Sequence, residues 1–278
     1  MRKDPIGLGL KSSVGLSKAR GGILGMHQGF VITLPEDNSA INQNVAVFGK
    51  GKQKMKEYAI NTIYQASRRD ESILVADPTG ELHKQTKKFL ENAGYKVVAT
   101  VVQNGILGIP NTNELLMRKC ACFLVSKSAS FSKRHSFIID TLKYALAVSQ
   151  PHPNKRLCIP MTVILYNMPK IGTIPNLHQV VTESCGIGIK VSLIAESLHI
   201  LMRQYPGGAW RELLDSFDTY LLMGDADTRT TIYIAKLIGG KRLATVNACI
   251  VSRMPNGQWG YCYVGGFTSS LFRAYLEV

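Results

Sequence analysis

The chain has 278 residues, of which 45% are hydrophobic, and its 33 basic and 19 acidic residues give a formal net charge of +14. This composition is ordinary for a globular protein with a sizeable core, and no apolar run approaches the roughly 18 residues that would span a bilayer. The basic excess favours anionic partners such as nucleic acid, nucleotides or an acidic membrane surface, although a basic surface that only keeps the protein soluble is the alternative.

The first residues contain no continuous apolar segment of the kind found in secretory signals. We therefore expect no direct membrane span and a cytoplasmic location, with any association at the cytoplasmic face of the membrane made through partners.

The six cysteines and six histidines do not form a metal-binding pattern. No CxxC or HExxH spacing occurs, and Cys120 and Cys122 fall on one face of a predicted strand, which suits tetrahedral zinc poorly. We expect reduced thiols, mostly in the core, and no metal site.

Residues 1–43, rich in glycine and serine, open the chain and predict a β-hairpin across residues 22–34. Short apolar runs then follow, and continuous rather than alternating runs are typical of strands buried on both faces of a parallel sheet. The predicted strands are 45–48, 73–76, 97–102, 120–125, 161–166, 191–195 and 220–223.

Helical patterns lie between several of these runs. In residues 79–95, Thr79 is expected to cap a helix and Gly94 to end it. The apolar stripe of this helix is Leu82, Thr86, Phe89, Leu90 and Ala93, and the stripe of a second helix is Phe137, Ile138, Leu142, Ala145 and Leu146. A third helical pattern, residues 227–240, ends on two glycines.

The last 36 residues are again rich in β-formers, with a hairpin turn predicted at Asn256-Gly257. We predict one domain over residues 1–278, which consists of a lead-in (1–43), an α/β core (44–242) and a β-rich extension (243–278). Repeated strand–helix–strand order with short links predicts a mostly parallel, doubly wound sheet.

Four segments in this order resemble a known family. They read SILVADPTGELHKQTKKFLENAGYKV (72–97), YNMPKIGTIPNLHQVVTES (166–184, after the apolar residues 161–165), GIKVSLIAESLHIL (188–201) and AWRELLDSFDTYLLMGDADTRTTIYIAKLIGGK (209–241). Together they resemble the VirD4/TraG-type coupling proteins of type IV secretion, which are RecA-like P-loop motor ATPases that recruit DNA and protein substrates in conjugation. The similarity covers roughly residues 20–242.

The resemblance implies a RecA-like P-loop NTPase fold and partners among type IV secretion or conjugation proteins, including an active coupling protein. It also implies an oligomer, whereas the basic composition predicts DNA contacts that would be non-specific and made to phosphates. Two parts of the family plan are expected to be missing, namely the N-terminal transmembrane pair and the helical insertion after the third strand, where only residues 103–119 stand.

The stretch VAVFGKGKQKMKEYA (45–59) occupies the position of the family's phosphate-binding loop. With Gly49 as the first glycine of GxxxxGK[ST], Lys54 stands in place of glycine, Met55 in place of lysine and Lys56 in place of Ser or Thr, and no other register completes the pattern. We interpret this stretch as a vestigial phosphate loop, whose residues are Gly49, Lys50, Gly51, Lys52, Lys54, Met55 and Lys56.

The other positions that would serve the nucleotide are also altered. The second nucleotide strand of the family ends in two acidic residues, where this chain has Tyr166 and Asn167. Glu196 stands at the family's glutamine sensor of the γ-phosphate, and the family's arginines fall on residues 185–187, which read CGI. The family's turn motif remains as Asp77, Gly80 and Glu81, which we expect to form a turn and helix cap.

These changes predict a pseudo-ATPase that has no catalytic residue, is not an enzyme and uses neither ATP nor Mg²⁺. It would act as a binding or regulatory component in conjugative DNA transfer. Its four loop lysines would hold a phosphate without cleaving it, contact a nucleic-acid backbone, or be solvated without a ligand. The alternatives are a divergent but active ATP-dependent DNA-transfer motor and a structural or decaying module without a nucleic-acid role.

Overall fold

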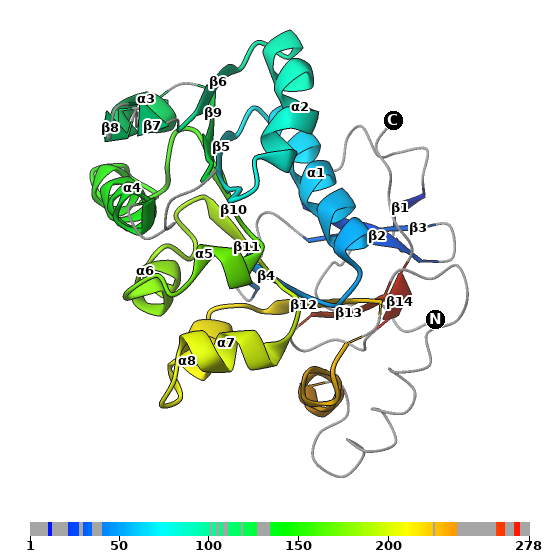
Figure 1. Cartoon of the computed structure of the whole chain (residues 1–278). Coiled ribbons are helices and arrows are strands. Elements are labelled where there is room, and N and C mark those ends of the chain that lie inside the picture. Colours follow the sequence, from blue (N-terminus) through cyan, green and yellow to red (C-terminus); the bar gives the residue numbers. More distant parts are fainter. Residues whose placement is uncertain are drawn as a thin grey trace.

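A computed structural model of the chain shows a twisted sheet with helices on both faces (Figure 1). It describes residues 11–12, 22–27, 30–34, 41–100, 102–103, 106–107, 111–117, 119–126, 134–224, 226–237, 260–264 and 270–272. The predicted turn at Asn256-Gly257 and the glycines that end the third helical pattern lie outside these residues.

The central sheet has nine strands in the order β14-β13-β12-β4-β11-β10-β5-β9-β6. Seven consecutive strands of this order, from β12 to β6, are parallel, and β13 and β14 add to the β12 edge as antiparallel strands. The strands are β4 (Val45–Phe48), β5 (Ser72–Ala76), β6 (Lys96–Ala99), β9 (Cys120–Leu124), β10 (Met161–Tyr166), β11 (Ile189–Ala195), β12 (Thr219–Met223), β13 (Gly260–Val264) and β14 (Ser270–Phe272). The predicted α/β class with a mostly parallel sheet is confirmed.

Two smaller sheets accompany the central one. β2 (Ile23–His27) and β3 (Phe30–Thr33) form the predicted hairpin, and β1 (Lys11–Ser12) pairs with β3. β7 (Val102–Gln103) pairs with β8 (Ile106–Leu107).

The predicted strand 97–102 is corrected, because β6 ends at Ala99. At Thr100 the side-chain hydroxyl, rather than the backbone, accepts the N–H of Val125 at 3.0 Å. This side-chain bond replaces the next backbone bond of the ladder, so regular pairing stops there.

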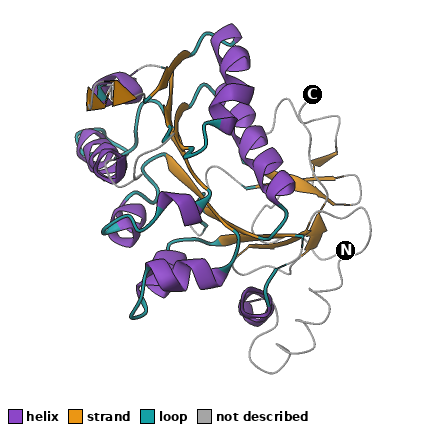
Figure 2. Ribbon diagram, viewed as in Figure 1, coloured by secondary structure: helices purple, strands orange, loops and turns teal. Residues whose placement is uncertain are grey.

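The helices are α1 (Lys52–Arg68), α2 (Glu81–Asn92), α3 (Thr112–Met117), α4 (His135–Ser149), α5 (Met168–Ile171), α6 (Leu177–Glu183), α7 (Leu198–Gln204) and α8 (Ala209–Asp215), and residues 228–237 are also helical. α1 and α2 lie together on one face of the sheet, and α4 to α8 lie on the other (Figure 2).

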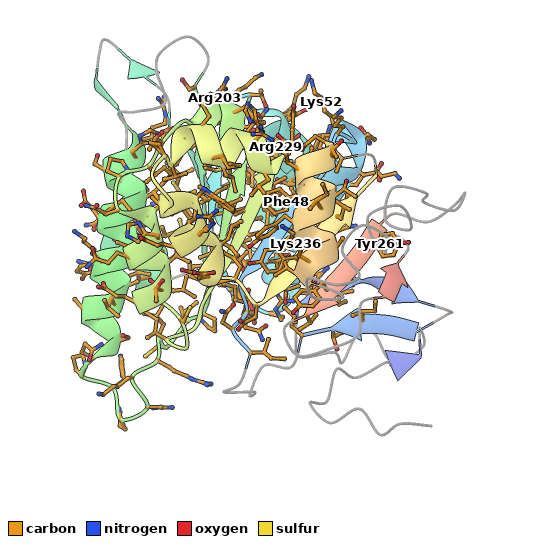
Figure 3. The ribbon with its side chains drawn as sticks, turned by 90° about the horizontal axis from the view of Figure 1, so that it is seen from below. Phe48, Lys52, Arg203, Arg229, Lys236 and Tyr261 are labelled. Carbon is orange, nitrogen blue, oxygen red and sulfur yellow. The ribbon has the colours of Figure 1, made fainter. Side chains whose placement is uncertain are left out.

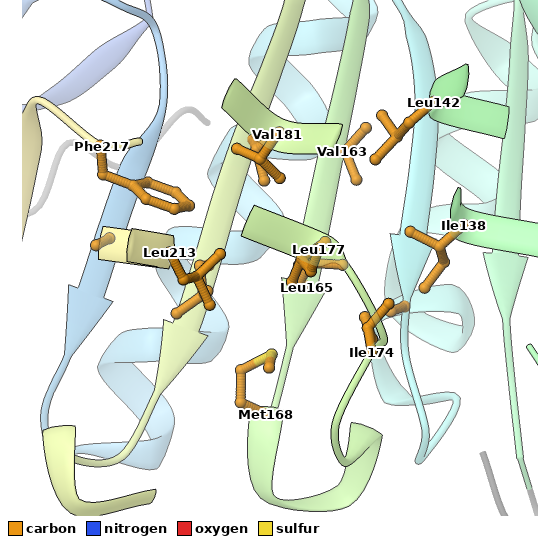
Figure 4. Packing of buried hydrophobic residues seen from close by; sticks show 14 of the residues in the cluster. Ile138, Leu142, Val163, Leu165, Met168, Ile174, Leu177, Val181, Leu213 and Phe217 are labelled. Carbon is orange, nitrogen blue, oxygen red and sulfur yellow. The ribbon is translucent and has the colours of Figure 1, made fainter. Parts of the chain in front are cut away.

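Alternate residues of each strand supply the two apolar layers. In β4, Val45 and Val47 belong to the layer under α1 and α2, and Ala46 and Phe48 to the opposite layer. Figure 4 shows the latter layer, where Ile138 and Leu142 of α4 and Leu177 and Val181 of α6 point at Val163 and Leu165 of β10. Burial of both faces explains why these strands read as continuous apolar runs.

The predicted helix stripes are confirmed with one exception. In α2, Leu82, Thr86 and Leu90 are buried and Phe89 packs against the core, but Ala93 follows the helix end and is exposed. All five predicted residues of the α4 stripe are buried or packed against the core. Gly94 ends α2 in a left-handed conformation (φ 81°), as predicted.

Cys120 and Cys122 are buried in one apolar layer as free thiols. Within the described part of the chain, no three His, Cys, Asp or Glu side chains gather as metal ligands would. No described helix is both long enough and apolar enough to cross a membrane.

Candidate functional site

The candidate site lies at the carboxyl edge of the sheet, where β4, β10 and β11 end side by side. A cavity of about 420 Å³ opens there. Its lining residues are Lys52, Gln53, Met55, Lys56, Thr79, Glu81, Tyr166, Asn167, Pro169, Lys170, Ile194 and Glu196. Residues from four separate sequence motifs therefore meet in one cavity.

The connection between β4 and α1 has only three residues, Gly49, Lys50 and Gly51. Helix α1 begins at Lys52, and the Met55 N–H already donates to the Gly51 carbonyl at 3.0 Å. The predicted vestigial loop is therefore corrected in extent. Its later members, Lys52, Lys54, Met55 and Lys56, belong to the first turns of α1.

Gly49 holds this short connection against the end of β12. Its φ is +151°, and a Cβ atom added there would lie 1.9 Å from the carbonyl oxygen of Met223. Such contact is impossible for any side chain, so glycine is required by the close approach of two backbones. The connection is thus fixed by packing against the neighbouring strand.

The four lysines of this segment diverge. Lys52 and Lys56 line the cavity, whereas Lys54 lies over the end of β12, with its Nζ 3.8 Å from the Cβ position of Gly224. Lys50 is exposed and lines a second cavity beside the first. The alternating lysines therefore do not converge on one point.

β10 ends at Tyr166, which lines the cavity together with the next residue, Asn167. The Tyr166 hydroxyl donates a hydrogen bond of 2.9 Å to Glu81 Oε1. Burial raises the pKa of Tyr166, and the hydrogen bond and negative charge of Glu81 raise it further, so the phenol stays protonated and acts as a donor. Asn167 has a left-handed backbone (φ 67°) where α5 begins.

The turn between β5 and α2 is built around Asp77. This side chain is fully buried, and its carboxylate accepts the N–H groups of Gly80 and His83, both at 3.0 Å. Burial raises the pKa of Asp77, and these hydrogen bonds partly offset that effect. The predicted turn and cap are confirmed, but Asp77 rather than Thr79 supplies the cap.

Glu81 faces the cavity from the start of α2. Its Oε1 lies 3.2 Å from the Thr79 hydroxyl and also accepts the Tyr166 bond. Gly80, which precedes it, is left-handed (φ 73°), and a Cβ there would lie 3.0 Å from Val125 Cγ1. Glycine therefore sets the turn that aims Glu81 at Tyr166.

A second cavity, of about 450 Å³, lies where β11 and the segment after β12 leave the sheet. Its lining residues are Lys50, Glu196, Ser197, His199, Asp227, Thr228 and Arg229. Figure 3 shows Lys52, Arg203 and Arg229 at the same end of the molecule. Glu196, directly after β11, lines both cavities.

Several lining residues were missed from the sequence. Thr79, Lys170 and Arg229 lie inside the segments that carry the family resemblance, and their closeness to a strand end was the available signal. His199 and Asp227 also lie in these segments, within four residues of a strand end. They meet only because β4 lies between β11 and β12 in the sheet.

The Asp77 cap gives a direct test of the turn. Asp77→Ala is expected to lower the free energy of unfolding by about 1–2 kcal/mol, because two backbone N–H groups lose their acceptor. Thr79→Ala, the matched control, is expected to change it by less than about 0.5 kcal/mol. Urea denaturation followed by circular dichroism measures both, and a larger loss for Thr79→Ala would contradict this assignment of the cap.

Residues 160–256 match a family model described as the TraM recognition site of TraD and TraG. No curated protein sequence matches the chain closely enough to be counted as a relative.

Solved structures share the fold at low sequence identity. The plasmid coupling protein TrwB in complex with the GTP analogue GDPNP is 10% identical, over 96% of this chain and 93% of that chain, with a TM-score of 0.62. VirB4 of Thermoanaerobacter pseudethanolicus is 9% identical, over 92% of this chain and 96% of that chain, with a TM-score of 0.61. The genome packaging NTPase B204 from Sulfolobus turreted icosahedral virus 2, in complex with ATP-gammaS, is 10% identical. The match covers 84% of this chain and 98% of that chain, with a TM-score of 0.53.

The fold matches extend over nearly the whole chain, and the family match begins at β10 and includes the second-strand and sensor positions. The chain therefore has the fold of these P-loop NTPases, and residues 160–256 are similar to the TraM recognition site of TraD and TraG, as the sequence resemblance implied.

Proposed function

We propose that this chain is a catalytically inactive relative of the conjugative coupling proteins, a pseudo-ATPase that binds or regulates other components of DNA transfer. The observation that carries the proposal is the three-residue connection between β4 and α1. A phosphate cradle needs a longer run of loop residues whose backbone N–H groups turn toward one anion. Gly49–Gly51 supplies only three loop residues. The Met55 N–H group already donates a hydrogen bond to the Gly51 carbonyl within α1.

The end of β10 supports the same proposal. Mg²⁺ is bound through carboxylates and substrate phosphates, and hydrolysis needs a group that orients the attacking water. Tyr166 supplies a protonated phenol whose hydrogen is engaged with Glu81, and Asn167 supplies a neutral amide. Loss of transition-state charge stabilisation alone costs on the order of 10³-fold in rate, so we expect no useful turnover.

The proposed partners follow from the family match. The family model concerns recognition of TraM by TraD and TraG, so we propose that this chain contacts conjugation proteins, or an active coupling protein, at the cytoplasmic face of the membrane. The basic surface would add non-specific, salt-dependent contacts to DNA phosphates.

The proposal is tested by ATP turnover. Phosphate release from Mg·ATP by the purified chain is expected to equal the rate without protein. If release is above background, the same assay on a Lys52→Gln/Lys56→Gln variant decides its origin, with Lys87→Gln on the exposed face of α2 as the matched control. Turnover that vanishes in the cavity variant and persists in the control would overturn the proposal, because it would come from this site.

A further inference from the structure

Glu196 lines two neighbouring cavities, each of which also has basic side chains in its lining. Lys52, Lys56 and Lys170 line the first cavity, and Lys50 and Arg229 line the second. Glu196 is in the lining of both, at the carboxyl end of β11, and 38% of its side chain is exposed. Its charge therefore acts on any ligand that enters either cavity.

The other carboxylates of the two cavities are engaged in local structure. Glu81 Oε1 accepts the Tyr166 hydroxyl, and the Asp227 carboxylate accepts the backbone N–H groups of Arg229 and Thr230 at 3.0 and 3.2 Å. Glu196 is placed differently. Its ion pair with Lys52 is long, at 4.0 Å, and the Lys52 side chain is 83% exposed. A pair this open is weak and screened by solvent, so the Glu196 charge stays available.

We infer that Glu196 sets the charge selectivity of this edge of the sheet, so that it repels polyphosphates which the surrounding lysines and Arg229 would otherwise attract. The inference rests on the proposed function, since it explains how a P-loop fold rich in lysine would not bind a nucleotide. Replacement by glutamine removes the repulsion, releases Lys52 from its ion pair and keeps the size of the side chain.

The experiment is a calorimetric titration of inorganic tripolyphosphate into the full chain and into Glu196→Gln, without Mg²⁺, at pH 7.5 and 50 mM salt. A polyanion several ångströms from one removed carboxylate is expected to bind about tenfold more tightly to the variant, with the gain falling as salt increases. Glu183→Gln, at an exposed position at the end of α6 and outside both cavities, is the matched control and is expected to bind as the wild type does.

A second variant locates the gain in the cavities. Glu196→Gln combined with Lys52→Gln is expected to bind less tightly than Glu196→Gln, because a cation paired with Glu196 is lost, and more tightly than Lys52→Gln alone, because the repulsion by Glu196 is removed in both backgrounds. Equal affinity of the wild type and Glu196→Gln, or an equal gain in Glu183→Gln, would overturn the inference. Neither result bears on ATP turnover, so the proposed function would stand or fall separately, and thermal melts confirm that the variants are folded.

Discussion

Replacing Gly49 by alanine is expected to lower the free energy of unfolding by at least about 3 kcal/mol. The added Cβ would meet the Met223 carbonyl oxygen at 1.9 Å and the carbonyl carbon at 2.8 Å. Both atoms belong to the backbone of a central strand, so no side chain can turn aside to relieve the clash. Either β4 or β12 must move, and ladder hydrogen bonds between them are lost.

Gly51→Ala is the matched control for this prediction. Gly51 precedes α1 with a φ of −73°, and its added Cβ would lie 3.5 Å from Lys54 Cδ, which is ordinary contact. The cost is expected to be about 1 kcal/mol or less, from the poorer capping of alanine. Urea denaturation compares the two variants, and similar midpoints would show that the tight approach of Gly49 to Met223 does not exist in solution.

The sheet could be predicted from the sequence because burial on both faces leaves a continuous apolar signature. Six of the seven predicted strands match observed strands within two residues at each end, and the seventh ends early at Thr100. β6 ends early because the Thr100 hydroxyl accepts a hydrogen bond from Val125, which is 25 residues away in the sequence. No local sequence pattern predicts such a contact. The choice of Asp77 over Thr79 as the α2 cap depends in the same way on how the turn folds back.

The site could be predicted only in part. Parallel strands end at one edge, so the motifs at Tyr166 and Glu196 had to meet near the start of α1. The length of the β4–α1 connection could not be predicted, because the eight-residue pattern GxxxxGK[ST] does not say where the helix begins. The lysines of α1 diverge because they point from different sides of its first turns. The second cavity exists because of the order of the strands in the sheet. Neither feature can be read from the sequence alone.

A buried network of charged side chains lies at the amino edge of the sheet, opposite the candidate site. Glu71 is 1% exposed, and its carboxylate lies 2.6 Å from Arg69 Nε, from Lys190 Nζ and from the Thr162 hydroxyl. Glu71→Gln is expected to cost about 3–5 kcal/mol, because two mostly buried cations lose their counter-charge. Glu91→Gln, whose exposed pair with Lys87 measures 3.8 Å, is the control and is expected to cost less than about 0.5 kcal/mol.

The same network makes stability depend on pH. Burial alone would raise the pKa of Glu71, but the charges and hydrogen bonds of Arg69 and Lys190 outweigh it and hold the pKa below its ordinary value of 4.5. The stabilisation is therefore fully present above pH 4.5 and is lost as the pH falls through the lower pKa of the folded state. In urea denaturation between pH 7 and pH 3, the stability gap between wild type and Glu71→Gln is expected to narrow only below about pH 4.5. A gap that stays constant or widens in acid would show that the Glu71 carboxylate is not stabilised by these cations.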